Sequence, residues 1–314
     1  MKPRRVVIFG GTGFVGRSLV PRLLRDGHEL LVPSRNRTLR RELHVIPDVT
    51  VVDADIHSQA ELHRLLEGAQ VAINLVGILN ERGRDGSGFR TVHVELTEKI
   101  IAACRATGTR RLLQMSALNA GRGSSHYLQS RGEAEARVKA SELDWTLFQP
   151  SVIFGPGDGL FERFATLLRL TPVLPLARAQ TKFAPVHVGD VAEAFARALD
   201  NPKCHRQTYE LYGPEVMTLA EIVRYTAHCL GVRRFVLPLP DALGRLQAAL
   251  MDFVPGKPFS SDNFRSLLLD SVGGIDGLYQ LGIDKTPVAA VVPAQLAKSA
   301  RQQRLDRYRQ TARR

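Results

Sequence analysis

Three side chains that could move a proton or orient a carbonyl lie close together in the sequence. Ser116 ends a short apolar run, and Tyr127 stands eleven residues later. Residue 131 is four positions beyond Tyr127, so the two side chains would share one face of a helix. A positive charge beside a tyrosine lowers the pKa of the phenol and suits it to general acid and base work. Residue 131 is an arginine, which places charge there but cannot release a proton.

Each of these positions also has a plainer interpretation. Ser116 could simply end a strand, and Tyr127 could be an aromatic residue of the core at the start of a helix. Arg131 is either a tolerated replacement in an arginine-rich chain or a sign that proton-relay chemistry has been lost. We expect lost or strongly weakened catalysis.

A glycine-rich turn near the N-terminus indicates phosphate binding. The apolar run Val6–Phe9 leads into the spacing G-x-x-G-x-x-G, and an amphipathic pattern follows. Such glycines permit a tight turn, let the main chain approach a pyrophosphate and let the helix pack on the strand. The N-terminus of the helix supplies free N–H groups for the phosphates. The predicted nucleotide contacts here are Gly10, Thr12, Gly13, Phe14, Val15 and Gly16.

The end of the second expected strand bears on which dinucleotide is bound. An NAD site usually has an acidic residue there for the ribose 2′-hydroxyl, but this chain has Arg35 and no acid. Arg35 and Arg17 could both pair with a 2′-phosphate. NADP(H) is therefore favoured and NAD(H) is the alternative, because general arginine richness would also explain both residues.

The elements that would position these residues alternate along the first half of the chain. Short apolar, β-branched runs alternate with helical patterns, which predicts an α/β fold with a Rossmann-type doubly wound parallel sheet. The expected strands are 6–9, 29–33, 49–53, 71–76, 111–116 and 146–148. The expected helices are near 14–26, 58–67, 92–107 and 128–142, with another at 190–200 that Asp190 would cap.

Domain boundaries follow from a change of pattern after Pro150. We expect a nucleotide-binding domain over 1–155, completed by about 183–200, and a smaller C-terminal substrate or partner lobe over 156–297. A basic tail covers 298–314. Within the lobe, residues 242–254 have helical apolar periodicity, which suits core packing or, as the sharper alternative, docking to a partner or a membrane surface.

Composition narrows the function classes. The chain has 314 residues and a net charge of +12, and the tail alone holds seven basic residues against one acidic residue. The body is only mildly basic, so nucleic-acid binding is not expected. Three widely spaced cysteines argue against a disulfide framework and a zinc site, so no metal is expected. No apolar run reaches membrane-spanning length, and we expect a cytoplasmic protein.

Several motifs together resemble the atypical and extended short-chain dehydrogenase/reductase superfamily, which includes NAD-dependent epimerases and dehydratases. They are the glycine spacing, the Ser116, Tyr127 and residue 131 set, the element Pro150–Asp158 and the element Phe183–Ala192. The resemblance implies that Ser116 orients the substrate and that Tyr127 is the acid/base, with a lysine expected where Arg131 stands. It also implies further cofactor contacts from Asp55, Ile56, Asn74, Leu75, Val76, Gly77, Tyr127, Arg131, Pro150, Val152 and Ile153.

Asp55 would accept a hydrogen bond from adenine, although it could instead be an acid at the start of a helix. Gly77 would let the main chain approach the cofactor ribose, or could be an ordinary glycine at a strand end. His187 is expected to be structural.

A narrower resemblance connects the chain to the NAD(P)H-binding accessory subunit of respiratory complex I, its bacterial relatives and an accessory protein of ubiquinone biosynthesis. It implies a structural or weakly catalytic protein within a respiratory-chain or quinone-biosynthesis complex. The alternatives are an active NADP-dependent oxidoreductase or epimerase on an unknown small molecule, and a binding module that senses the NADPH/NADP⁺ ratio. The basic tail could add peripheral contact with the inner face of the plasma membrane.

Overall fold

The computed structural model describes residues 3–35, 47–255 and 257–297. The chain divides into two compact units, and each unit gathers separated stretches of sequence. The first unit comprises Met1–Pro150, Gly189–Leu211 and Gly273–Asp284. The second comprises Ser151–Val188, Tyr212–Val272 and Lys285–Arg314. The basic tail expected over 298–314 lies outside the described residues.

A seven-stranded sheet with order β11-β6-β5-β4-β1-β2-β3 forms the centre of the first unit, and all neighbouring strands are parallel. This order confirms the doubly wound fold. The winding changes direction between β1 and β4, where ligands bind in such sheets. The strands are β1 (Arg5–Phe9), β2 (Glu29–Ser34), β3 (Val49–Asp53), β4 (Val71–Asn74), β5 (Arg111–Met115), β6 (Asp144–Pro150) and β11 (Gln207–Leu211).

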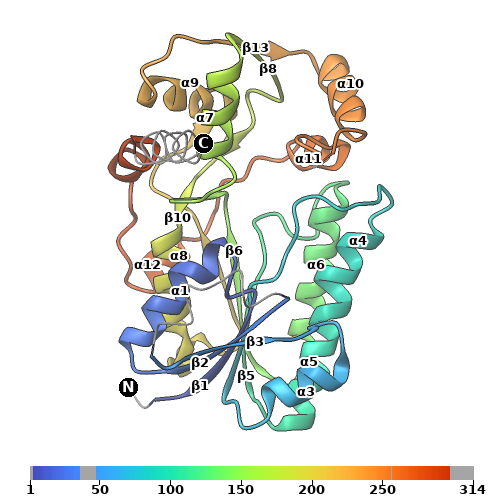
Figure 1. Ribbon diagram of the computed structural model, residues 1–314, viewed down its shortest axis with the longest axis vertical. Coiled ribbons are helices and arrows are strands. Elements are labelled where there is room, and N and C mark those ends of the chain that lie inside the picture. Colours follow the sequence, from blue (N-terminus) through green and yellow to red (C-terminus); the bar gives the residue numbers. More distant parts are fainter. Residues whose placement is uncertain (1–2, 36–46, 256, 298–314) are drawn as a thin grey trace, which may run out of the picture. The chain divides into compact units, whose positions relative to one another are not determined.

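Helices cover both faces of this sheet (Figure 1). One face carries α1 (Phe14–Arg25) and α8 (Val188–Leu199), and the other carries α3 (Gln59–Leu66), α5 (Leu96–Thr107) and α6 (His126–Lys139). The central strands are buried on both faces because helices pack on both, which explains their uninterrupted apolar runs. The unit also contains α4 (Ser87–Phe89), a π-helix (Arg90–Glu95), a 3-10 turn (Pro202–Cys204) and α12 (Gly277–Gln280).

Local sequence signals set most of the helix ends. Ser125 precedes α6 and its hydroxyl accepts the amide of Leu128 at 3.4 Å, while Gly108 ends α5 in the left-handed conformation. The expected cap at Asp190 was wrong. Helix α8 begins at Val188, so Asp190 lies in its first turn, where a negative charge favours the positive end of the helix dipole.

The second unit has no large sheet in its described residues. Three short strand pairs, β10–β7, β12–β9 and β13–β8, pack with α7 and α9 around two small apolar cores. Its labelled elements are β7 (Ile153–Phe154), α7 (Phe161–Leu170), β8 (Val173–Ala177), β9 (Lys182–Phe183), β10 (Val186–His187), β12 (Met217–Thr218), α9 (Leu219–Cys229), β13 (Phe235–Leu239), α10 (Asp241–Met251) and α11 (Ser261–Ser266). The described residues 288–297 are also helical. Among the helices of the described chain, none has the length and hydropathy that crossing a bilayer requires.

Candidate functional site

The glycine turn lies between β1 and α1, at the carboxyl edge of the sheet. Gly10 has a φ of +80°, which a residue with a side chain rarely adopts, and its carbonyl accepts the amide of Gly13 at 2.9 Å. A Cβ on Gly16 would lie 2.3 Å from the carbonyl oxygen of Gly11, so α1 packs directly on the turn only because Gly16 lacks one. Gly13 caps α1 and is exposed. This cradle with its helix N-terminus fits the phosphates of a dinucleotide.

Two cations lie beside this cradle at the same edge of the sheet. Arg17 is exposed on the first turn of α1, and Arg35 is exposed directly after β2. Thr12, Phe14 and Val15 of the turn are half-buried. Both arginine side chains are open to solvent, and their pairing with a 2′-phosphate on the ribose stays a prediction.

The end of β3 carries the residues expected near adenine. Asp55 is exposed, and its Oδ1 accepts the amide of His57 at 2.9 Å. Ile56 is half-buried against the core between the sheet and α3. The carboxyl group therefore helps to shape the turn that leads to Ser58 and α3, while its second oxygen is available to a ligand amide. The adenine contact stays a prediction.

Asn74 at the end of β4 is turned into the protein. Its amide nitrogen donates to Gln114 at 3.0 Å and its oxygen accepts the amide of Val76 at 3.1 Å, and only 1% of the residue is exposed. Leu75 donates its amide to Phe9 on β1. Asn74 thus fixes the turn after β4. The cofactor contacts expected from Asn74, Leu75, Val76 and Gly77 stay predictions.

Arg131 joins the ends of two strands. Its Nη1 donates to the carbonyl of Met115 at 3.1 Å and to that of Val76 at 3.4 Å, and its guanidinium lies 5.6 Å from the centre of the Tyr127 ring. The side chain is nearly buried, with 6% exposed. A Cβ on Gly77 would lie 1.9 Å from Nη2 of Arg131. Gly77 therefore makes room for the guanidinium, a role that the sequence did not suggest.

Two polar atoms close to this cluster lack hydrogen-bond partners within the described chain. They are the hydroxyl of Ser116 and Nε of Arg131, and both are buried. The main-chain amide of Ser116 donates to Phe148 at 2.7 Å, which fixes the residue at the end of β5. Leaving a buried polar atom unpaired costs about 1–3 kcal/mol. Such atoms fit a bound molecule with its own polar groups.

His93 was missed by the sequence analysis. It lies on the π-helix, and its ring packs edge-on against Tyr127 with 5.6 Å between ring centres. The Nε2 atom accepts the amide of Ile78 at 3.2 Å, and Nδ1 lies 2.8 Å from the hydroxyl of Ser130, which donates to the carbonyl of Tyr127. The proton on the ring must then be on Nδ1. An isolated histidine in a helical pattern carries no signal for this role.

The pKa of His93 explains how the ring can sit beside a cation. Burial, with a smaller contribution from Arg131, lowers the pKa of His93 to about 2. The ring is therefore neutral near pH 7 and keeps the single tautomer that its two neighbours require. Phe89 completes an aromatic enclosure, with its ring centre 6.0 Å from that of Tyr127.

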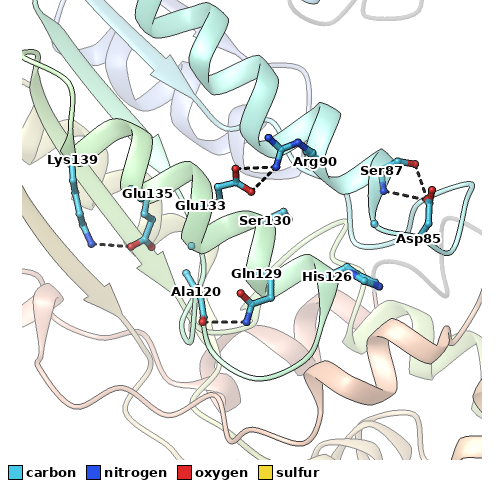
Figure 2. Close-up of a pocket in the computed structure, with 14 residues that line it drawn as sticks. Asp85, Ser87, Arg90, Ala120, His126, Gln129, Ser130, Glu133, Glu135 and Lys139 are labelled. Atoms are coloured by element: carbon cyan, nitrogen blue, oxygen red, sulfur yellow. Dashed lines mark hydrogen bonds and ion pairs between the residues drawn. The ribbon is translucent and has the colours of Figure 1, made fainter.

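A groove lies on the outer side of α6, and neither Tyr127 nor Arg131 lines it. Its volume is about 750 Å³, between α6 and residues 85–90. Figure 2 shows Arg90 bonded to Glu133, and Lys139 bonded to Glu135, across its wall. Because these charges neutralise one another, the groove offers no unpaired group among these four to a ligand.

The last predicted contacts fall on both sides of the boundary between the units. Pro150 ends β6 and its carbonyl accepts the amide of Leu118 at 2.9 Å. In the second unit, the carbonyl of Val152 accepts the amide of Val186 at 3.0 Å, and Ile153 begins β7 beside β10. Their contacts with a cofactor stay predictions.

Comparison with known families gives one match, which covers most of the first unit and residues 151–188 of the second. The NAD(P)H-binding family matches residues 10–202, a range that includes the glycine turn and every strand from β2 to β10. The match ends just before β11.

Two curated relatives share about three tenths of their residues with this chain. Ceramide reductase of Caulobacter vibrioides is 32% identical over 256 residues, which cover 79% of this chain and 77% of the relative. The mitochondrial 40 kDa subunit of NADH-ubiquinone oxidoreductase of Neurospora crassa is 30% identical over 219 residues. That match covers 68% of this chain, and this chain spans only 57% of the Neurospora subunit.

Solved structures agree on the fold. A dTDP-glucose 4,6-dehydratase double mutant from Streptomyces venezuelae with NAD bound superposes with a TM-score of 0.75 at 19% identity. It matches 93% of this chain and 96% of its own. The Thermus thermophilus UDP-glucose 4-epimerase complex with NAD gives a TM-score of 0.64 at 23% identity, over 83% of this chain and 99% of its own. At sequence identities this low, the similarity establishes the fold and not the function.

Proposed function

This chain belongs to the NAD(P)H-binding, atypical short-chain dehydrogenase superfamily of epimerase- and dehydratase-like proteins, and from that premise we propose that it holds NADP(H) while turning it over slowly or not at all. The observation that carries this proposal is the position of Arg131. Its guanidinium donates to the carbonyls of Val76 and Met115 and fills the space that Gly77 leaves open.

The chemistry of Arg131 supports weak turnover. A bound nicotinamide cofactor supplies a hydride to, or accepts one from, a substrate carbon. Tyr127 would then donate or accept the accompanying proton, and a group beside it must restore its protonation state. Arg131 can stabilise the tyrosinate by its charge, but it cannot pass on a proton. With an arginine at 131, the protein would therefore still bind the cofactor, but the transfer of protons to and from Tyr127 would be interrupted.

The preference for NADP(H) is part of the proposal. Arg17 and Arg35 are both exposed at the edge of the sheet where the adenosine ribose would lie. A 2′-phosphate between two guanidinium groups gains an ion pair on each side, while the 2′-hydroxyl of NAD(H) is uncharged and offers only a neutral acceptor. Gly10, Gly13 and the first turn of α1 would hold the pyrophosphate.

The cellular role that fits such a site is an accessory one. The Neurospora relative is named as a subunit of NADH-ubiquinone oxidoreductase, and an accessory subunit needs a stably bound nucleotide more than a rapid reaction. We place this protein in a complex of respiration or quinone metabolism on that basis.

A second candidate is an active NADP-dependent reductase. It is favoured by the buried, unpartnered hydroxyl of Ser116, which is suited to orient a carbonyl, and by the Caulobacter relative that is named a ceramide reductase. The substrate would carry a carbonyl or hydroxyl group that Ser116 and Tyr127 contact together.

One experiment separates the two candidates. The purified protein is analysed for retained nucleotide, and NADPH and NADH are titrated by fluorescence into the wild type, Arg131→Lys and Arg35→Gln. We expect NADPH to bind at least about tenfold more tightly than NADH, and Arg35→Gln to remove most of that difference. Arg131→Lys should leave NADPH affinity within about threefold of wild type.

Turnover of the same samples decides between binding and catalysis. The accessory proposal expects bound NADPH to stay reduced for hours with carbonyl substrates present. Oxidation at about 1 s⁻¹ or faster, which is ordinary for an enzyme, would establish the reductase instead. A preference for NADH would contradict the roles given to Arg17 and Arg35.

A further inference from the structure

Exposed apolar side chains gather on two neighbouring elements of the second unit. Fifteen large apolar residues are exposed in the described chain, and seven of them lie on β13, on α10 and in the turn after α10. These seven are named the apolar face: Phe235, Leu237, Leu243, Leu246, Leu250, Phe253 and Val254. Exposed apolar clusters of this kind mark interaction sites in stable proteins.

Helix α10 has two apolar sides, and only one of them packs on the protein. Gly244 and Ala248 are buried, and a Cβ on Gly244 would lie 2.9 Å from the Cβ of Ala177. Leu243, Leu246 and Leu250 follow at intervals of three and four residues, so they form one stripe on another side of the helix. Their exposed fractions are 51%, 55% and 62%. The stripe is therefore not the packing side of the helix.

The strand before α10 repeats the arrangement. In β13, Phe235 and Leu237 point to solvent with 63% and 41% exposed, while Val236 between them is buried. Exposed and buried side chains alternate in this way when one side of a strand packs on the protein and the other faces solvent. The strand pairs with β8, and Gln247 of α10 donates to Pro175 of β8 at 3.3 Å. Helix and strand therefore belong to one packed substructure.

The charges on these elements are not balanced at the surface. Both oxygens of Asp241 accept from Arg178 at 3.1 Å, and Asp252 accepts the amide of Ser261 at 3.1 Å. Arg233, two residues before β13, and Arg245 on α10 are exposed, and no carboxylate of the described residues pairs with them. The guanidinium of Arg245 instead lies 5.8 Å from the ring centre of Phe264. The carboxylates are engaged within the protein, whereas Arg233 and Arg245 are exposed without a carboxylate partner among the described residues, and Arg245 keeps its contact with Phe264.

We propose that the apolar face docks on the surface of an anionic lipid bilayer, with α10 lying in the plane of the interface. A bilayer interface offers acyl chains for Leu246 and Leu250 and anionic headgroups for Arg233 and Arg245. A second copy of this chain fits less well, because a two-fold contact through the same face would bring these arginines toward their own counterparts. The proposal uses only the second unit and does not depend on which nucleotide the first unit holds.

The test is flotation of the full chain with vesicles of phosphatidylcholine alone and of phosphatidylcholine with phosphatidylglycerol. We expect binding to the anionic vesicles only. Leu246→Gln/Leu250→Gln should weaken it by about tenfold or more, because the change removes apolar contact without altering charge. The matched control is Val216→Gln/Tyr279→Gln, which changes two exposed apolar residues outside the face and should bind like wild type.

The arginines are tested in the same assay. Arg233→Gln/Arg245→Gln should weaken binding by about fivefold for each charge removed, whereas Arg110→Gln/Arg224→Gln, with the same net charge, should bind like wild type. Every variant keeps residues 298–314, so the basic tail cannot produce these differences. Thermal unfolding checks that each variant is folded.

Three results would overturn the proposal. The first is wild-type binding by Leu246→Gln/Leu250→Gln, and the second is an equal loss in its control. The third is a wild-type dimer that the leucine variant dissociates, together with no vesicle binding, which would assign the face to a second copy.

Discussion

Arg131 and Gly77 form a matched pair. The guanidinium of Arg131 occupies the space where a Cβ of residue 77 would lie. It donates to the carbonyl of Val76, the residue before Gly77, and to the carbonyl of Met115 on the next strand. A lysine at 131 has no planar head to place there, and its ammonium would leave that space free. The arginine that stands at 131 in place of the expected lysine is thus accommodated because residue 77 has no side chain.

The first prediction concerns this pair. Gly77→Ala should destabilise the protein by about 1–3 kcal/mol, because the new methyl group overlaps the guanidinium of a nearly buried arginine. In an Arg131→Lys background the same change should cost markedly less. Urea unfolding of the two single variants and the double variant measures the coupling. Additive free energies would show that the two residues do not meet.

The second prediction concerns His93. Its pKa is about 2 when folded and about 6.5 when unfolded. Between these values the unfolded chain binds a proton at this position and the folded protein does not. Stability is therefore lost as the pH falls below about 6.5, and the loss from His93 reaches about 1.4 kcal/mol at pH 5.5.

Urea unfolding at pH 7.5 and 5.5 checks this. The pH-dependent loss should shrink in His93→Gln, which can still accept from Ile78 and donate to Ser130, and should persist in His63→Gln, where the histidine is exposed on α3. An equal loss in wild type and His93→Gln would contradict the burial of a neutral ring.

Part of the site follows from residue types alone. Gly10, Gly13 and Gly16 could be predicted from the sequence, because a tight turn from a strand into a helix requires glycines at fixed spacing. The contact between Gly77 and Arg131 could not be predicted from the sequence, because the two residues meet only when α6 packs beside the end of β4. The same holds for His93, whose partners Ile78 and Ser130 come from other elements.

At the scale of elements, the π-helix places the site's aromatic residues. It lies between α4 and α5 and carries His93, while Phe89 ends α4 directly before it. A π-helix widens the turn by one residue, and such segments often occur at functional sites. Its effect here is to bring the His93 ring against Tyr127 on α6 without interrupting the buried side of α5.

The third prediction concerns the packing of α1 on the glycine turn. Gly16→Ala should cost about 3 kcal/mol or prevent folding, because its Cβ would lie 2.3 Å from a main-chain oxygen of the turn. Gly27→Ala is a useful control for the general cost of replacing a glycine, since nothing lies within 4 Å of its Cβ position although its φ is +79°. Thermal unfolding compares the two. Equal, small losses would mean that α1 can move away from the turn.

Strands and helices with their own periodicity were predictable, and those defined by distant partners were not. Strands β1 to β6 were predicted because each contains a short apolar, β-branched run, which in the central strands β1, β4 and β5 reflects burial on both faces. Strand β11 was missed, since Gln207–Leu211 contain no continuous apolar run and the place of the strand beside β6 depends on a partner some sixty residues earlier. The π-helix was missed because its apolar pattern continues into α5 without a break.

At the scale of the molecule, the chain alternates between its two units. It leaves the first unit after Pro150, returns with Gly189–Leu211 and returns again with Gly273–Asp284. The first return supplies most of α8 and all of β11, so the sheet that carries the nucleotide site is completed by residues distant in sequence. Phe148 on β6, for example, lies 4.1 Å from Phe195 between ring centres.

The fourth prediction tests this dependence with the single tryptophan. Trp145 lies on β6, 7% exposed, and its carbonyl accepts the amide of Arg206 just before β11. A fragment of residues 1–150 should therefore show tryptophan emission close to that of the urea-unfolded chain, while the full chain emits at shorter wavelength. A fragment with native-like emission and a cooperative unfolding transition would show that β6 does not need β11.

The same interleaving has a consequence during synthesis. A ribosome that has just released Pro150 still has to make more than a hundred residues before Asp284 emerges, which takes on the order of ten seconds. Until Leu211 has been made, which is a little under half of that time, the nascent chain exposes the free edge of β6, with no β11 to cover it. An unpaired strand edge of this kind pairs readily with other chains, so the yield of folded protein depends on how nascent chains are kept apart while the second half is made.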